Sequence, residues 1–88
     1  MGHTVIEDVE DRVENRVIRR KIIQTNDPQY PSGYRYALHH GYTDGGGTIL
    51  RYDNENDTVG RHERHTGTEV SKIEFPGMME LRDRFLNR

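Results

Sequence analysis

The feature that most constrains the fold of this chain is a run of three glycines, residues 45–47, between two segments that alternate apolar and polar residues. Glycine readily adopts positive φ, so such a run can reverse the chain within a few residues. The flanking segments, residues 34–42 and 48–54, have the two-residue period of β-strands. The sequence therefore predicts an antiparallel hairpin joined by a five-residue loop, residues 43–47.

The same alternation predicts the register of the hairpin and the face on which each side chain lies. Pairing Tyr42 with Thr48 gives a ladder of His40 with Leu50, His39 with Arg51, Leu38 with Tyr52, and Ala37 with Asp53. One face then holds the core side chains, with His40 at its edge: Tyr36, Leu38, Leu50 and Tyr52. The other face holds the polar side chains Arg35, His39, Arg51 and Asp53.

Core material is scarce, because apolar residues make up 31% of the 88 residues. A domain of this length buries about 60–65% of its unfolded surface. The absence of cysteine excludes disulfides, thiol catalysis and thiolate zinc sites. No apolar run reaches the length of about 18 residues that spans a bilayer, and the acidic N-terminal stretch lacks the apolar centre of a signal peptide. We therefore expect a single cytoplasmic domain, residues 1–88, that does not enter a membrane.

The acidic segment at residues 1–15 fits two structures. Thr4 and Glu7 make a capping-box pattern, and three valines follow at the four-residue spacing of a helix face. Valine, however, favours strands, and the same positions also fit an extended arm that leads into the next strand. The sequence leaves both a short helix and an arm open.

The remaining elements are predicted from the positions of turn-forming residues and from the spacing of apolar residues. Apolar and basic residues interleave in a strand over residues 13–24, prolines and turn residues make a loop of residues 26–33, and a last strand covers residues 69–75. Pro76 suits the first turn of a helix whose apolar stripe is Met78, Met79, Leu81, Phe85 and Leu86. The sequence thus predicts an α+β fold. A small antiparallel sheet of three to four strands lies within residues 16–75, and a C-terminal helix, residues 76–88, packs on one face.

Charge is segregated along the chain although the net charge is only -2. Residues 1–15 carry five acidic residues against one arginine, whereas residues 16–52 carry six basic residues against two aspartates. Arginine outnumbers lysine eleven to two. The planar guanidinium makes bidentate contacts with phosphate, so this bias is typical of polyanion recognition, although a GC-rich genome produces the same bias whatever the function.

The densest group of polar residues lies in residues 51–65 and predicts acid–base chemistry on RNA. Cleavage through the 2′-hydroxyl needs a base, an acid and a cation that stabilises the charged phosphorane. Imidazole exchanges protons near neutral pH, so His62 and His65 are the candidate acid and base, and Asp53 is a candidate base or orienting group. The candidate phosphate contacts are Arg51, Arg61, Arg64, His39 and Arg35.

A metal site is a weaker interpretation of the same residues. The possible ligands are His39, His40, His62, His65 and Asp53. His-x-x-His is common by chance, and the adjacent histidines at 39 and 40 point to opposite faces of a strand. The glycine run leads into a strand and not a helix, so it is no phosphate-binding loop. We therefore expect a metal-independent endoribonuclease with no cofactor.

Structural explanations compete with this prediction. Single exposed histidines and arginines are usually solvated surface residues, and Asp53 with Asn54 can start a turn at a strand end. The same Arg-rich face also fits a non-enzymatic module that binds nucleic acid or protein. In a third interpretation, the acidic segment docks on a basic surface of its own chain or of a second copy, which would give a homodimer.

The block 34–65 also resembles the toxin family of the TumE/TumA type toxin–antitoxin systems. The likeness rests on the strand of residues 34–39, the glycine-rich turn, the strand end Leu50-Arg51-Tyr52-Asp53-Asn54, a histidine-rich segment and the closing helix. It covers roughly residues 17–88. Residues 55–60 separate the Asp-Asn pair from the histidines, which departs from the family pattern. The resemblance implies a small cytosolic toxin whose partner is a helix-turn-helix antitoxin that binds operator DNA.

Overall fold

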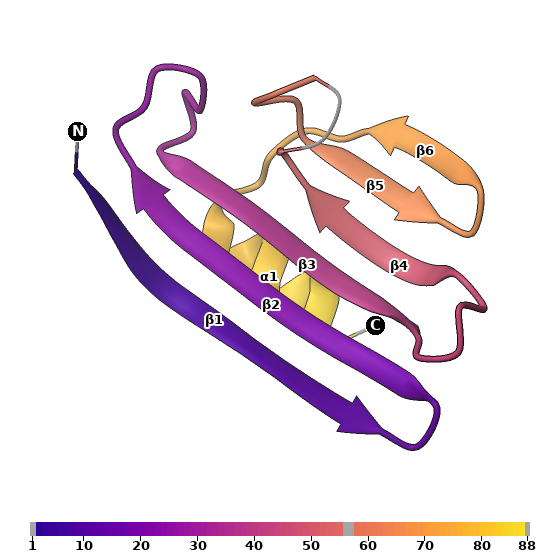
Figure 1. Cartoon of the computed structure of the whole chain (residues 1–88). Coiled ribbons are helices and arrows are strands. Elements are labelled where there is room, and N and C mark those ends of the chain that lie inside the picture. Colours follow the sequence, from indigo (N-terminus) through magenta and orange to yellow (C-terminus); the bar gives the residue numbers. More distant parts are fainter. Residues whose placement is uncertain (1, 56–57, 88) are drawn as a thin grey trace.

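The chain forms one antiparallel sheet with a helix on one face in a computed structural model that describes residues 2–55 and 58–87 (Figure 1). In these described residues the six strands lie in chain order: β1 His3–Val13, β2 Arg16–Thr25, β3 Tyr34–Tyr42, β4 Thr48–Asp53, β5 Glu63–Thr66 and β6 Glu69–Lys72. The helix α1, Met78–Leu86, crosses behind β2 and β3 (Figure 1). The α+β class and the C-terminal helix are confirmed, whereas the expected number of three to four strands is too low.

The acidic segment accounts for one of the additional strands, because it is neither a helix nor a free arm. Its residues pair along the whole length of β2, with Glu10 opposite Arg19 and Asp8 opposite Lys21. The Arg19 guanidinium lies 2.9 Å from the Asp8 carboxylate. The acidic segment therefore docks on a basic strand of its own chain. The two oppositely charged segments of the sequence become neighbouring strands, β1 and β2.

The other additional pairing comes from residues 63–72. Glu63–Thr66 has no clear strand pattern in the sequence, but it forms β5 and pairs with both β4 and β6. The last strand ends at Lys72, earlier than the expected residue 75. Phe75 instead leaves the sheet and stacks on the ring of His62.

The predicted hairpin register is confirmed for its four inner pairs. His40 pairs with Leu50, His39 with Arg51, Leu38 with Tyr52, and Ala37 with Asp53. The starting pair differs: Thr48 lies opposite Gly41 and not Tyr42, because the register shifts by one residue between His40 and Gly41. The shift lies at the end of the strand pair next to the turn, so the sorting of the inner side chains onto two faces stays as predicted.

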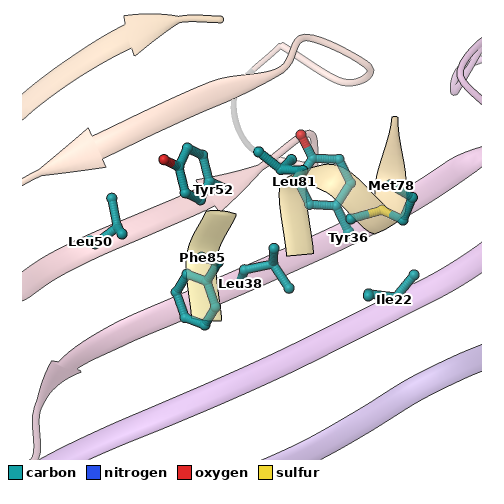
Figure 2. Packing of buried hydrophobic residues seen from close by; sticks show 8 residues of the cluster. All are labelled: Ile22, Tyr36, Leu38, Leu50, Tyr52, Met78, Leu81 and Phe85. Atoms are coloured by element: carbon teal, nitrogen blue, oxygen red, sulfur yellow. The ribbon is translucent and has the colours of Figure 1, made fainter. Parts of the chain in front are cut away.

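The core lies between α1 and the sheet, as Figure 2 shows. Leu81 and Phe85 of the helix are completely buried against side chains of the central strands, and the ring of Phe85 meets the ring of Tyr52 edge-on at a centroid distance of 6.5 Å. The buried apolar cluster comprises Ile22, Tyr36, Leu38, Leu50, Tyr52, Met78, Leu81 and Phe85. These residues all lie on the α1 side. The opposite side, which we call the open face, has no helix over it among the described residues.

α1 is also tied to the edge strand by charge. Arg82 donates two hydrogen bonds to the Glu7 carboxylate, at 2.9 and 3.0 Å, and Arg20 of β2 lies 3.1 Å from the same carboxylate. α1 has nine residues, and within the described chain no helix has the length and apolar character needed to cross a membrane.

Replacing Glu7 with Gln tests this contact between helix and edge strand. The hydrogen bond from Arg82 is the main cause that holds the pKa of Glu7 below its ordinary value of 4.5. A carboxyl group with a lowered folded-state pKa stabilises the fold above its unfolded pKa and loses that effect as the pH falls through the folded one. We expect Glu7→Gln to lower the free energy of unfolding by about 1 kcal/mol at pH 7, and the difference to shrink below pH 4.5.

Urea unfolding of the two proteins between pH 7 and pH 3 measures this effect. Glu80→Gln is the matched control, because Glu80 is exposed and its pair with Arg84 spans 3.7 Å. Equal losses in the two variants at pH 7 would contradict a special role for Glu7.

Candidate functional site

The sheet register brings three of the candidate side chains into one row on the open face. His39 of β3 lies opposite Arg51 of β4, and Arg51 lies opposite His65 of β5. Neighbouring antiparallel strands are about 4.8 Å apart, so the two histidine backbones are separated by about 10 Å with the arginine between them. We call His39, Arg51 and His65 the histidine row.

The next row of the same face supplies carboxylates. Asp53 of β4 lies between Ala37 of β3 and Glu63 of β5. Arg51 Nε donates a hydrogen bond of 2.6 Å to Asp53 Oδ2. His65 Nε2 lies 3.6 Å from the same oxygen and 3.5 Å from Glu63 Oε1. Asp53 therefore fixes the arginine of the histidine row, and both carboxylates face the imidazole of His65.

Several polar atoms of these two rows are buried without a hydrogen-bond partner in the described part of the chain: His39 Nδ1, Asp53 Oδ1 and His65 Nε2. Leaving a buried polar atom unpaired costs about 1–3 kcal/mol, and native folds contain few such atoms. Their concentration at one place on the sheet is a common property of binding and catalytic sites, where the missing partner is supplied by a ligand.

His39 is held in an uncharged form more strongly than an ordinary histidine. Burial is the largest cause that lowers its pKa, and the charges of Arg51 and His40 act in the same direction. Gly41 makes room for the ring, because a Cβ at that position would lie 2.7 Å from His39 Nε2. The neutral imidazole beside an arginine can accept a proton near neutral pH.

The two histidines expected to act together, His62 and His65, are not brought together. His62 lies on the α1 side of the sheet, where its ring stacks on Phe75 at 4.3 Å and its Nδ1 shares a 2.8 Å hydrogen bond with the Tyr36 hydroxyl. Burial lowers the pKa of His62 and also raises that of Tyr36. This geometry gives His62 a packing role at the edge of the core.

The candidate arginines are spread over both faces. Arg61 lies beside the carboxylates, with Nε 3.4 Å from Glu63 Oε2. Arg35 is on the open face, but its guanidinium contacts Glu55 at 2.7 Å, which also receives Lys21. Arg64 pairs with Tyr52, so it lies on the α1 side and is exposed. Arg51 is thus the candidate arginine within the histidine row, and Arg61 is the candidate arginine beside it.

Two residues of the site are not among the sequence candidates. Glu63 completes the carboxylate row, and its place could be found only by recognising β5 and its register. Asn54 is completely buried, accepts the backbone N–H of Tyr36 at 3.0 Å and donates to the carbonyl of Tyr34 at 2.7 Å. Its amide continues the pairing to β3 where β4 ends, and this fixes the end of the strand that carries Asp53.

The site also contains a set of donor atoms that could hold a metal ion. One atom from each of Asp53, Glu63 and His65 lies within 4.8 Å of the other two. This group differs from the set that the sequence suggested, because Arg51 separates His39 from His65 and because His62 lies on the other face. It combines two carboxylates with one imidazole.

Comparison with known proteins identifies the family. The family model described as Toxin TumE matches residues 3–88, which include every strand, the helix and both rows of the open face. No curated protein and no solved structure matches the chain. Membership of a toxin family implies a cognate antitoxin as partner. The sequence resemblance is thereby confirmed over nearly the whole chain: the protein belongs to the TumE toxin family.

Proposed function

We propose that this toxin is a metal-independent endoribonuclease whose active centre is the histidine row on the open face. The observation that carries the proposal is the position of Arg51 between two imidazoles, His39 on one neighbouring strand and His65 on the other. Attack by a 2′-hydroxyl and departure of a 5′-oxygen occur on opposite sides of a phosphorus atom. A cation flanked by a base and an acid fits that requirement.

Each residue of the row then has a role. His39, neutral because of its lowered pKa, accepts the proton of the 2′-hydroxyl as the 2′-oxygen attacks phosphorus. Arg51, aligned by Asp53, stabilises the negative charge that develops on the phosphorane oxygens. His65 donates a proton to the 5′-oxygen as its bond to phosphorus breaks. The products are a 2′,3′-cyclic phosphate and a 5′-hydroxyl.

The surrounding charges would position the RNA. Arg61 is 44% exposed beside Glu63, so it can reach a flanking phosphate. Arg35 lies farther from the row and is paired with Glu55, and Arg64 lies on the α1 side, so neither would contact the cleaved phosphate. The basic residues Arg19, Lys21 and Arg35 are paired with carboxylates of their own chain, so the open face offers RNA fewer free cations than the sequence suggests.

For the partner we infer a helix-turn-helix antitoxin, with the cytoplasm as the place of action. Family membership supports an antitoxin, and the sequence resemblance to the TumE/TumA type supports its class. A homodimer has less support, because β1, one candidate for contact with a second copy, pairs with β2 of its own chain.

Alanine substitution of the two row histidines tests the catalytic assignment. We expect His39→Ala and His65→Ala each to lower the rate of RNA cleavage at least about 100-fold, the usual contribution of one acid or base, and to abolish growth inhibition. His3→Ala is the matched control, since His3 is exposed on β1. Circular dichroism and thermal unfolding would verify that the variants remain folded. Salt-sensitive RNA binding without turnover would contradict the proposal and favour a binding module.

A third histidine variant separates this assignment from the pair expected from sequence. His62→Phe keeps an aromatic ring against Phe75 and removes the imidazole. We expect it to retain cleavage within about threefold, because changes outside the groups that transfer protons have small effects on a chemical step. A loss as large as that of His65→Ala would return His62 to the active centre.

The pH profile tests the base separately. A base acts when it is deprotonated, and burial together with Arg51 lowers the pKa of His39 below 6.5. The acidic limb of kcat/KM is therefore expected below pH 6.5, with activity maintained as the pH falls from 7 toward that value. A limb above pH 6.5, measured on a short RNA at constant ionic strength, would exclude His39 as the base.

A further inference from the structure

We propose that Asp53, Glu63 and His65 form a binding site for a divalent metal ion, with Zn²⁺ bound more tightly than Mn²⁺ or Mg²⁺. The three side chains come from two neighbouring strands, β4 and β5, and their donor atoms converge within 4.8 Å of one another. Asp53 and Glu63 are directly opposite each other in the pairing of β4 with β5. His65 is two residues farther along β5, on the same face, and its imidazole points toward both carboxylates.

The separations between donor atoms suit a small tetrahedral ion. Zn²⁺ binds nitrogen and oxygen ligands at about 2.0–2.1 Å, which places neighbouring ligand atoms about 3.3 Å apart. His65 Nε2 lies 3.6 Å from Asp53 Oδ2 and 3.5 Å from Glu63 Oε1. These two distances are within a few tenths of an ångström of that value, whereas the Asp53 and Glu63 oxygens are separated by up to 4.8 Å. A small rearrangement of the site would bring the three donor atoms to coordination distance and admit a fourth ligand.

Unpaired buried atoms give an independent reason to expect a ligand here. The Asp53 side chain is completely buried, yet its Oδ1 has no hydrogen-bond partner among the described residues. His65 Nε2, which faces both carboxylates, is buried and unpaired in the same part of the chain. A cation between these atoms would satisfy both, whereas solvation is prevented by their burial.

The two arginines leave suitable oxygens available. Arg51 bonds Asp53 through Oδ2, the oxygen that lies 3.6 Å from His65 Nε2, so an ion would either share Oδ2 with Arg51 or bind the unpaired Oδ1. Arg61 lies near Glu63 through Oε2 and leaves Oε1 available. Contacts of this kind orient ligating carboxylates in metal sites. The positive charge of the arginines opposes a cation, so we expect moderate affinity.

The donor set also predicts which ion binds. Imidazole suits Zn²⁺, whereas Mn²⁺ prefers carboxylate and water oxygens, and Zn²⁺ generally binds a given site more tightly than Mn²⁺ does. Mg²⁺ prefers oxygen ligands in octahedral geometry and keeps several waters. We therefore expect affinity to fall in the order Zn²⁺, Mn²⁺, Mg²⁺.

Binding would change the activity of the site. A His65 Nε2 that coordinates an ion cannot transfer a proton to a leaving oxygen, so Zn²⁺ would inhibit the side-chain mechanism. This consequence rests on the proposed function, whereas metal binding itself does not.

Calorimetric titration of the full metal-free chain with Zn²⁺ tests the site. We expect one ion per chain, and at least tenfold weaker binding in Glu63→Gln and in His65→Asn. Asp53→Asn should also weaken binding, but its loss of the Arg51 contact can perturb the fold, so the other two variants are decisive. The matched controls Glu69→Gln and His3→Asn are exposed residues of β6 and β1 and should bind within twofold of the unaltered chain.

The site would be overturned if the chain does not bind Zn²⁺ at a concentration of 1 mM, because the dissociation constant would then be above roughly 1 mM. Equal binding by the site variants, or loss of binding in His3→Asn alone, would do the same. RNA cleavage with and without Zn²⁺ separates the two proposals. Inhibition supports both, whereas binding without any cleavage supports the site and removes the proposed function. Cleavage that requires Zn²⁺ supports the site and overturns the metal-independent mechanism.

Discussion

The structure depends on the constraint that its apolar side chains suffice for only one face of a sheet. Central strands supply Tyr36, Leu38, Leu50 and Tyr52 to that face, and α1 covers them with Leu81 and Phe85. The β-strand period sends every alternate residue of the same strands to the other side. The chemistry of the open face is therefore a direct consequence of how the core is made.

The edge strand β1 is attached to the sheet mainly by polar contacts, because it contributes little apolar surface to the core. β1 has no buried side chain apart from the partly buried Glu7, and two of its acids, Asp8 and Glu10, lie opposite Lys21 and Arg19 of β2. Exposed ion pairs contribute little individually, so the backbone ladder and the partly buried Glu7–Arg82 contact hold this strand to the rest. The same pairing neutralises cations on the open face, where Arg19 lies beside Asp8.

The parts of the fold that can be predicted from sequence are those fixed by local patterns. Alternation around residues 45–47 predicts the hairpin register, and that register alone places His39, Arg51 and Asp53 on one face. β1 cannot be decided locally, because valines at four-residue spacing fit a helix as well as a strand. The pairing that settles it involves residues of β2, which lie outside any local pattern of the acidic segment.

The candidate site is predictable to the same extent. Residue type and spacing point to Arg51, Asp53 and His65, but the partners of His65 depend on β5, a strand too short to show a period of its own. Recognising that strand would separate His62 from His65, because positions three apart in an extended chain point to opposite faces. Glu63 could not be predicted as a site residue for the same reason. An acidic residue between two histidines indicates no particular role until its neighbours in the sheet are known.

The order of the strands has a kinetic consequence. Each described strand pairs with the strand next to it along the chain, so the sheet needs no long crossover. Folding is fast when contacts join residues close in sequence, and closing a long loop adds an entropic barrier. Docking of α1 is the distant event, because the helix packs on β3 and its Arg82 reaches back to Glu7 of β1. The rows of the open face require only β3, β4 and β5, so their register can form before the helix closes over the core.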